Sequence, residues 1–574
     1  MIILGLNCEH GDSSACIFRD GKLISAAEEE RFTRTKNCSD FPINAIKFCL
    51  NSSEVTINEI DYVSINTKSI YNIYYKIIFI IINPSFFFSL VKRFYNLLIK
   101  DNYAKYNLNF FFKKKFKLIY TPHHLAHALS AINFNKPQKN NLVFSFDGSG
   151  DFSTIECYLI NDNNIKLVDR TVFPNSLGFL YTAFTQFFGF SNYGDEYKVM
   201  GLSGYGKPIY EEKILKLIKS LVPFKLNMKY FNIPKIDYST GKPIVELIYN
   251  DKFTDLFGSP RNQNEDFIDQ IYKDYAASIQ KVFENIVLTS LSKLKKKYGC
   301  KNLYLTGGCA LNGLTVSKIL ESCMFEDVRV GPAPNDAGGA IGSVASFYIK
   351  KNKIFDSLDD NPFLGSGYSD KYVQNHLIDN IENKDNYKIR FYDDFNELAA
   401  RAASIIKEKK IIFWFQDRME FGPRALGNRS ILANPSVKNI KDILNLKIKK
   451  REVFRPFAPA IMQEFAEDYF YMQGKESPFM NIIFKAKENT KNIFPGIVHV
   501  DGTSRVQTVS ERTNKKFYKL INEFYKITNY PILVNTSLNI NGPIAESPID
   551  AFNYFLESEV ESIVLNNWMI ELKK

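Results

Sequence analysis

The sequence predicts an α/β protein of two domains, residues 1–352 and 353–574. Two observations predict the class: strands ending in Gly/Asp turns occur twice in the first half, and a helix–strand–glycine turn–helix unit spans residues 269–321. A shift to Lys, Asn, Asp, Pro, Gly and Ser over residues 350–370 predicts the boundary. Hydrophobic residues make up 45% and charged residues 24% of the chain. Both are near the globular average, which argues against long disorder and a membrane-embedded bulk.

The first strands form a predicted hairpin. Residues 2–6 are a short apolar run and are expected to be the first strand. Residues 15–18 and 23–27 are apolar on either side of Asp20-Gly21, and both turn residues tolerate positive φ. Three consecutive strands are therefore expected at the N-terminus.

A second arrangement of this kind begins at residue 142. Residues 142–146 are predicted as a strand that runs into the turn D-G-S-G-D, residues 147–151, and residues 154–160 as the next strand. Two polar turns that face each other bracket the phosphates of a nucleotide well, because their backbone N–H groups converge. The repeated pattern therefore indicates a nucleotide site.

The apolar stretch of residues 70–99 has two interpretations. Asn83-Pro84-Ser85 interrupts it, and only fifteen residues separate Lys76 from Lys92. That is too short for a bilayer, which needs about 20 apolar residues. The stretch, with its continuation to residue 117, is either a helical cover over a sheet or an interfacial patch in weak contact with a membrane surface.

A long amphipathic helix is predicted before the glycine turn. Apolar residues recur close to every 3.6 positions from residue 269 to 297, basic residues fill the last turn, and Gly299 is the expected stop. Further elements are expected at residues 301–306 (strand), 312–321 (helix), 398–407 (helix), 411–415 (strand) and 532–535 (strand).

Half of the six histidines lie in His123-His124-Leu125-Ala126-His127. On a helix, His123 and His127 share one face, which suits a first-row metal, although a structural pair is the simpler alternative. The segment lacks the glutamate of H-E-x-x-H, which argues against a metalloprotease. Asp336 lies in a turn of small residues and is either the N-cap of a helix from about residue 337 or a third metal ligand.

Arginines mark the second domain. Arg424 lies in F-G-P-R-A-L-G-N-R-S, and Arg455 follows a dense basic run from Lys447. A guanidinium matches the geometry of phosphate oxygens, and Gly, Pro and Phe surroundings favour a buried anion site. Residues 499–505 and 535–539 add polar groups beside predicted strands.

Charge and cysteine content indicate which cellular compartment and which kinds of binding partner to expect. The net charge of +11 comes from 73 basic and 62 acidic residues that are interleaved, so we expect a solvated surface and no nucleic-acid partner. The eight cysteines include no C-x-x-C pair, which excludes a zinc ribbon. Without a signal-peptide pattern, a cytoplasmic location is expected.

Together these motifs resemble the carbamoyltransferase family of the nodulation-protein and antibiotic O-carbamoyltransferase type, over nearly the whole chain. The blocks in the first domain are G-D-S-S-A-C-I-F-R-D-G, A-A-E-E-E-R-F-T-R, H-H-L-A-H-A, S-F-D-G-S-G-D, D-E-Y-K-V-M-G-L, L-T-G-G-C-A-L-N and P-A-P-N-D-A-G-G-A. Those in the second are E-F-G-P-R-A-L-G-N-R-S, R-E-V-F-R-P-F-A-P, H-V-D-G-T-S-R-V-Q and N-T-S-L-N. So many blocks in one order make the resemblance specific.

The resemblance implies an ASKHA-type N-terminal domain and a C-terminal domain like threonylcarbamoyl-AMP synthase. It implies that carbamoyl phosphate and ATP, with Mg²⁺, give carbamoyladenylate in the second domain. The carbamoyl group then moves to a hydroxyl of a sugar or secondary metabolite in the first domain, beside iron(II) or another divalent metal. Carbamoyladenylate hydrolyses readily, so water must be kept away from it. The acceptor is not identified by the sequence, and an oligomer is compatible with it.

The resemblance also assigns residues. The implied metal ligands are His123, His127 and Asp336. The residues against the nucleotide are Gly307, Gly308 and Asn312, with Asp147 from the second turn. Lys449 and Arg455 hold carbamoyl phosphate, and Arg424, Arg505, Asn535 and Ser537 complete the adenylation pocket. Asp12 joins His127, Arg424 and Arg455 as a catalytic candidate, although His10-Gly11-Asp12 departs from the His-Asp pair that the family often has.

Three other functions compete with this one. A tRNA threonylcarbamoyladenosine-type transferase is compatible with the basic charge, but the C-terminal motifs match the O-carbamoyl family better. A sugar kinase of the ASKHA superfamily shares the two phosphate turns and leaves the C-terminal arginines unexplained. A non-enzymatic nucleotide-binding assembly factor would not need the metal ligands and arginines.

Overall fold

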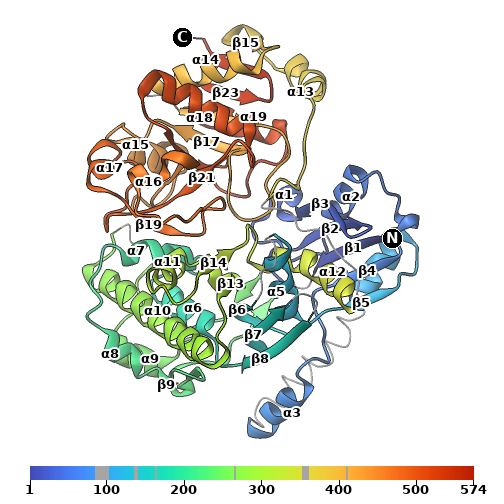
Figure 1. Ribbon diagram of the computed structural model, residues 1–574, viewed down its shortest axis with the longest axis vertical. Helices are drawn as coiled ribbons and strands as arrows, with labels where there is room; N and C mark the ends of the chain where they lie inside the picture. Colours follow the sequence, from blue (N-terminus) through green and yellow to red (C-terminus); the bar gives the residue numbers. More distant parts are fainter. Residues whose placement is uncertain are drawn as a thin grey trace. The chain divides into compact units, whose positions relative to one another are not determined.

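The computed structural model describes residues 1–8, 10–83, 103–134, 140–161, 164–238, 240–263, 267–351, 361–408 and 411–573. The chain divides into two compact units, residues 1–359 and 360–574 (Figure 1). The boundary predicted between residues 352 and 353 lies outside the described residues. Across the described part of the chain, no helix is long and apolar enough to span a membrane.

The first sheet of unit 1 has the strand order β3-β2-β1-β4-β5. Its strands are β1 (Ile2–Asn7), β2 (Ser14–Arg19), β3 (Lys22–Glu28), β4 (Tyr62–Ile65) and β5 (Leu118–Tyr120). Strands β1, β2 and β3 are an antiparallel meander, and β4 and β5 continue the sheet in parallel from β1. Asp20 and Gly21 both have positive φ, 51° and 89°, which confirms the predicted hairpin.

The second sheet repeats this topology. Its strands are β6 (Asn141–Gly150), β7 (Ser153–Asn161), β8 (Asn164–Val172), β13 (Asn302–Thr306) and β14 (Asp327–Val330). They are ordered β8-β7-β6-β13-β14, with an antiparallel meander followed by two parallel strands. The doubled order confirms the ASKHA-type first domain. Asp12 lies in the turn after β1, whereas Asp147 lies within β6, because the strand predicted to end at residue 146 continues to Gly150.

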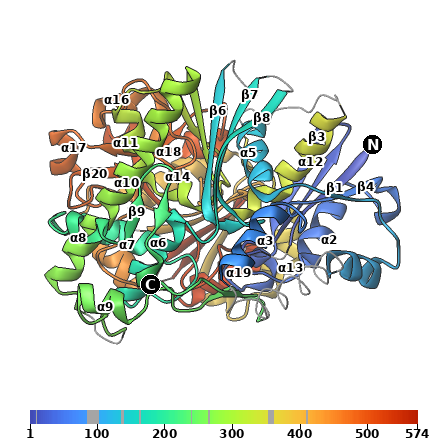
Figure 2. The same ribbon diagram turned by 90° about the horizontal axis from the view of Figure 1, so that it is seen from below.

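Two helices, α5 (His123–Asn133) and α12 (Gly339–Lys350), pack against each other between these sheets (Figures 1 and 2). A Cβ on Gly342 would lie 1.7 Å from the carbonyl oxygen of Ala126, so only glycine permits this approach. Helix α12 also contacts β1 and β4, and α5 contacts β6 and β13. The pair therefore fixes the histidines of α5 relative to both sheets.

The other helices of unit 1 surround the second sheet or border the first. They are α1 (Glu30–Thr33), α2 (Ile43–Ser52), α3 (Ile73–Ile82), α6 (Leu177–Phe187), α7 (Glu196–Ser203), α8 (Glu211–Leu215), α9 (Asp251–Phe257), α10 (Gln270–Tyr298) and α11 (Gly313–Glu321). Short strands β9 (Ile218–Ser220), β10 (Lys225–Leu226), β11 (Ile236–Asp237) and β12 (Ile244–Val245) form two small ribbons. Helix α10 ends at Gly299, which has φ of 65°, as predicted.

The apolar insert divides into two described parts, and its residues 84–102 lie outside the described residues. Residues 103–112 are helical, and Ala104 and Leu108 are buried in the core that covers the first sheet. This part is the helical cover that was predicted. Helix α3 differs, because Ile77, Ile81 and Ile82 are 50%, 71% and 70% exposed.

Unit 2 is built on one mixed sheet of eight strands, in the order β15-β24-β23-β16-β17-β22-β18-β21. Their bounds are β15 Tyr387–Phe391, β16 Ile411–Phe415, β17 Arg429–Ala433, β18 Ala458–Met462, β21 Gln507–Val509, β22 Ile532–Ser537, β23 Ser562–Leu565 and β24 Trp568–Leu572. A separate ribbon pairs β19 (Ile483–Lys485) with β20 (Thr503–Arg505). The predicted α/β second domain is confirmed.

The core of unit 2 lies between this sheet and helices α14 (Phe395–Lys407) and α18 (Lys515–Thr528). Trp414 of β16 and Phe524 of α18 are fully buried there. The remaining helices are α13 (Asp370–His376), α15 (Ile440–Asp442), α16 (Ala466–Tyr469), α17 (Glu488–Ile493) and α19 (Pro548–Leu556). The expected helix at residues 398–407 and the strands at 411–415 and 532–535 are all present.

Candidate functional site

The histidine pair lies at the start of α5. His123 is the first residue of the helix and His127 lies one turn later, so both rings project from one face. Their Nε2 atoms are 3.0 Å apart, and each residue is 1% exposed. Two imidazole nitrogens that approach so closely in a buried position need a shared proton or a shared cation.

Two carboxylates complete this cluster. Nε2 of His127 lies 3.2 Å from Oδ2 of Asp147 and 3.2 Å from Oδ1 of Asp336, while Nε2 of His123 lies 3.4 Å from the same Asp336 oxygen. One ligand atom from each of the four residues falls within 4.8 Å of all the others. Two imidazoles and two carboxylates are a donor set that first-row divalent metals accept.

The structure corrects the interpretation of Asp336 as a helix cap. Asp336 begins a 3₁₀ turn that ends at Gly338, Asn335 occupies the cap position, and α12 starts only at Gly339. The Asp336 carboxylate points to the histidines instead. A short turn of small residues therefore delivers the carboxylate to the cluster.

The charges of the cluster stabilise one another. Burial alone would lower the pKa of His127, but Asp147 and Asp336 outweigh it and raise that pKa to about 9. Burial works to raise the pKa of Asp336, yet the histidines, His123 foremost, hold it well below its usual range. The four groups thus favour a state in which imidazolium, or a metal ion, offsets the two negative charges.

A further carboxylate anchors the helix that carries the histidines. Asp151 accepts hydrogen bonds from the backbone N–H of His123 (2.8 Å), the Thr67 hydroxyl (3.0 Å) and the Lys68 N–H (3.0 Å). It therefore joins the turn after β6, the segment after β4 and the first turn of α5. Sequence analysis assigned Asp147 of the D-G-S-G-D motif to the nucleotide and missed Asp151, although both lie in the motif.

The turn after β13 holds Asp147 in place. The N–H of Gly308 donates to Oδ2 of Asp147 at 3.0 Å. Gly307 has φ of 89°, and a Cβ there would lie 2.2 Å from the carbonyl oxygen of Phe146. Asn312 caps α11 by accepting from Thr315 N–H at 3.1 Å. These residues lie beside the cluster, and their contact with a nucleotide stays a prediction.

Asp12 lies beside the same cluster, in the turn after β1. Its oxygens accept from the side-chain amides of Asn335 (2.7 Å) and Asn37 (3.1 Å). Burial, then Glu30 and Asp336, raise the pKa of Asp12 to about 7. Sequence reasoning missed Asn37 and Asn335, because amides at such separations carry no spacing signal.

The neighbouring His10 lies against the histidine pair. Its ring centroid is 4.6 Å from that of His123. The turn that departs from the family pattern, His10-Gly11-Asp12, therefore still brings its two polar residues to the cluster.

In unit 2, the structure brings together Arg424 and Arg505. Burial lowers the pKa of Arg505 well below its usual range, and the positive charge of Arg424 adds to this. Arginines in a solvated surface segment would show neither this effect of burial nor this effect of a neighbouring positive charge. An anion between or beside the guanidinium groups would offset their repulsion.

Asn535 of β22 belongs to the same polar group. Its side-chain N–H group donates to Ala425 O (3.3 Å) and Gln507 Oε1 (2.8 Å), while its Oδ1 is buried without a hydrogen-bond partner in the described part of the chain. The loop that carries Arg424 is held by Glu420, whose Oε1 accepts from the backbone N–H groups of residues 426, 428 and 429. Sequence reasoning missed Gln507 and Glu420, although both lie in the quoted motifs.

Lys449 and Ser537 also meet. The Lys449 ammonium donates to the carbonyl oxygen and hydroxyl of Ser537 and to Asn539 Oδ1 (2.6 Å). Arg455 lies at the end of the basic run, with its guanidinium 3.4 Å from a carboxylate oxygen of Glu452. Arg455 is thus placed in the same unit, and its contact with carbamoyl phosphate stays a prediction.

Comparison with known proteins covers both units. Residues 2–345 match the family model described as Carbamoyltransferase N-terminus, and residues 403–572 match the one described as Carbamoyltransferase C-terminus. Nodulation protein NolNO of Sinorhizobium fredii is 33% identical over 98% of this chain and 79% of its own. Nodulation protein NolO of Bradyrhizobium diazoefficiens is 34% identical over 78% of each chain. The uncharacterized protein sll1178 of Synechocystis is 34% identical over 99% of this chain and 96% of its own.

Proposed function

The chain belongs to the carbamoyltransferase family, and from this premise we propose that it is an ATP-dependent O-carbamoyltransferase that uses carbamoyl phosphate. One observation carries the proposal. Each unit contains a group of side chains suited to one of the two half-reactions. Unit 1 holds a largely buried four-residue cluster with metal-ligand geometry, and unit 2 holds two half-buried arginines close enough to repel each other. A sugar kinase would not need the arginines of unit 2, and the family match extends over both units.

The proposed reaction has three steps, and each of them balances. Water releases inorganic phosphate from carbamoyl phosphate and leaves carbamate. A carbamate oxygen attacks the α-phosphorus of ATP, the bond to the β-phosphate oxygen breaks, and pyrophosphate leaves. The acceptor hydroxyl then attacks the carbamoyl carbon of carbamoyladenylate, AMP leaves, and the hydroxyl proton passes to a base. The products are the carbamate ester, AMP, pyrophosphate and phosphate.

Unit 2 is assigned to adenylation. Arg424 and Arg505 would take the phosphate charge of ATP and of the leaving pyrophosphate, with Mg²⁺ accompanying ATP, because buried guanidinium groups stabilise developing charge strongly. Asn535 would accept a hydrogen bond from the nucleotide through its buried Oδ1. Lys449 and Arg455 would hold carbamoyl phosphate, with the Lys449 ammonium also keeping Ser537 in position.

Unit 1 is assigned to transfer. The donor set of His123, His127, Asp147 and Asp336 fits a divalent metal, iron(II) or another, through imidazole Nε2 and carboxylate oxygens. Such an ion supplies Lewis acidity to a carbamoyl or phosphate oxygen. Asp12, beside this cluster, would receive the proton of the acceptor hydroxyl.

The acceptor is a hydroxyl of a sugar or secondary metabolite. The experiment that tests the proposed function is an acceptor screen with ¹⁴C-carbamoyl phosphate, ATP and Mg²⁺, read by label in a neutral product. Label in an alcohol or sugar supports O-carbamoyl transfer. Label in tRNA, or phosphorylation of a sugar by ATP with no use of carbamoyl phosphate, would refute it in favour of the alternative enzymes.

A further inference from the structure

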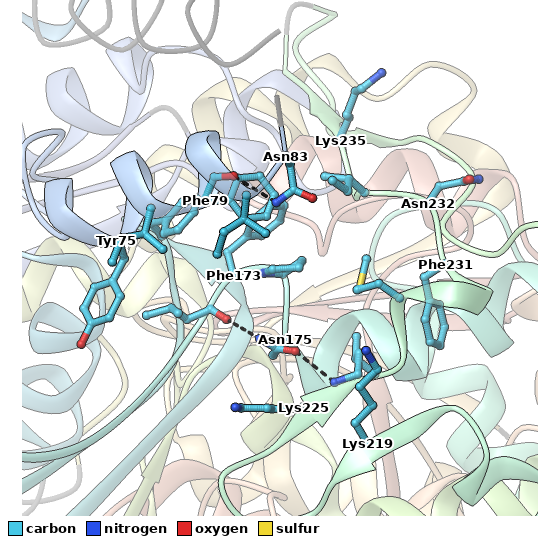
Figure 3. Close-up of a pocket in the computed structure, with 18 of the residues that line it drawn as sticks. Tyr75, Phe79, Asn83, Phe173, Asn175, Lys219, Lys225, Phe231, Asn232 and Lys235 are labelled. Atoms are coloured by element: carbon cyan, nitrogen blue, oxygen red, sulfur yellow. Dashed lines mark hydrogen bonds between the residues drawn. The ribbon is translucent and has the colours of Figure 1, made fainter. Parts of the chain in front are cut away.

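Unit 1 contains a cavity of about 1050 Å³ that the proposed chemistry does not use (Figure 3). It lies between α3, the segment that follows β8, and the ribbons of residues 218–247. Its volume is at the upper end of the range for small-molecule sites, roughly 300–1,000 Å³. The size is therefore sufficient for a ligand with a long chain.

One wall of the cavity is a face of α3. Tyr75, Ile78, Phe79 and Ile82 line it, at the spacing that places side chains on one face of a helix. Behind Phe79, the rings of Phe152 and Phe173 complete an aromatic cluster, with centroids 5.4–5.7 Å apart. This part of the cavity is apolar and favours a hydrocarbon chain.

Three lysines also line the cavity. They are Lys219, Lys225 and Lys235, and Figure 3 shows Lys219 and Lys225 apart from Lys235, which lies nearer Asn83. Glu246 is the sole acidic residue among the described lining residues. Glu246 lies 3.4 Å from Lys235, while no ion pair within the described chain engages Lys219 or Lys225. Two lysines beside an apolar wall are an arrangement that suits an anionic head group next to a chain.

We propose that this cavity binds a free, single-chain anionic amphiphile, with its alkyl chain against the aromatic cluster and its phosphate or similar anion at Lys219 and Lys225. This goes beyond carbamoyl transfer and does not depend on it. The cavity is close to the transfer cluster along the chain. Its lining residue Phe152 directly follows Asp151, and the Asp151 carboxylate accepts a hydrogen bond from the backbone N–H of His123.

The test measures binding of decyl phosphate to the full chain by calorimetry, below the concentration at which the amphiphile forms micelles. Decyl maltoside has the same chain without the charge, and inorganic phosphate has the charge without the chain. We expect one saturable site for decyl phosphate and binding at least about tenfold weaker for each of the other two. Absence of decyl phosphate binding by folded protein would overturn the proposal.

Matched variants locate the site. Lys219→Gln combined with Lys225→Gln should weaken binding by about tenfold or more, because a charge-assisted contact exceeds a neutral one. Lys216→Gln combined with Lys229→Gln makes the same charge change at exposed positions outside the cavity and should have no effect. Equal effects of the two pairs would overturn the site.

An apolar lining residue outside α3 has its own pair of variants. Leu247→Asp places a charge on an exposed lining residue and should weaken binding, whereas Leu215→Asp, exposed and outside the cavity, should not. Both leucines are exposed, so these variants are expected to fold. Co-sedimentation with anionic vesicles without binding of monomeric decyl phosphate would assign α3 to a membrane surface and overturn the cavity proposal.

Discussion

Nε2 of His127 lies 3.2 Å from Oδ1 of Asp336, although the two residues belong to distant parts of the sequence. His127 comes from α5 and Asp336 from the turn before α12, and these helices pack directly against each other. The packing of α5 on α12 thus sets the geometry of the cluster of His123, His127, Asp147 and Asp336, and Gly342 permits the close approach on which it depends.

His127→Ala should lower the content of divalent metal in the purified protein. The substitution removes the imidazole that contacts both Asp147 and Asp336, and leaves His123, 3.4 Å from Asp336, to offset the charge of the two carboxylates. Metal content after loading with iron(II) or manganese(II) and desalting is measured by mass spectrometry. His376→Ala, at an exposed site of unit 2, is the control. Unchanged metal in folded His127→Ala protein would remove His127 from the ligand set.

Asp151→Ala should weaken metal binding without removing a ligand. The loss of three hydrogen bonds frees the N–H of His123 and the backbone at Lys68, and costs about 1–3 kcal/mol of stability. We expect a higher dissociation constant for the metal and a lower melting temperature, with partial recovery of both in Asp151→Asn, which retains an acceptor. Metal affinity equal to wild type in both variants would contradict a positioning role for Asp151.

Glu29 should make the stability of the protein depend on pH. Its carboxyl group accepts hydrogen bonds from Asn44 and Ala45 at the start of α2. Burial nevertheless raises the pKa of Glu29 from 4.5 to about 7. The folded state therefore keeps the proton to higher pH than the unfolded chain, so this stabilisation is present below pH 4.5 and is lost as pH rises to about 7.

The Glu29→Gln variant isolates this effect because glutamine does not titrate. Relative to the variant, wild type should lose up to about 3 kcal/mol of unfolding free energy across that window. Urea unfolding of both proteins between about pH 4 and pH 8 measures the difference. A difference that stays constant with pH would show that Glu29 ionises normally in the fold.

Single substitutions should separate the two half-reactions. Arg455→Ala should abolish both pyrophosphate release and carbamoylated product, since Arg455 is the half-buried guanidinium proposed to hold carbamoyl phosphate through charge-assisted contacts. His127→Ala should retain much of the acceptor-independent pyrophosphate release and lose the product. Lys447→Ala, an exposed cation in the same basic run as Arg455, should retain both. Circular dichroism and melting curves establish that each variant is folded.

An equal loss of pyrophosphate release in folded His127→Ala and Arg455→Ala proteins would contradict this assignment. Adenylation would then depend on the cluster in unit 1, and the roles proposed for the two units would be exchanged or merged.

Local signals predicted much of the fold. The Asp20-Gly21 turn and Gly299 are visible in the sequence because positive φ at these positions depends on the residue itself. The spacing of His123 and His127 likewise required only the geometry of one helix. Such features need no knowledge of which strands pair.

Features that depend on tertiary packing were predicted less well. Asp147 was assigned to the nucleotide, which stays a prediction, while its contact with His127 arises from the pairing of β6 with β13 and the approach of Gly308 and was not predicted. Asp336 resembled a helix cap because the 3₁₀ turn before α12 gives no sequence signal. The exposure of α3 was left open between two alternatives, since an apolar helix is expected either to cover a sheet or to lie at an interface.

Pyrophosphate release tests the central claim most directly. Wild-type protein loaded with metal is mixed with Mg²⁺ and ATP, with and without carbamoyl phosphate, in the absence of any acceptor. The proposed function predicts that pyrophosphate and AMP form only when both ATP and carbamoyl phosphate are present, and that Arg455→Ala forms neither. Release of ADP and phosphate instead, or of no pyrophosphate from folded protein with both substrates, would contradict it.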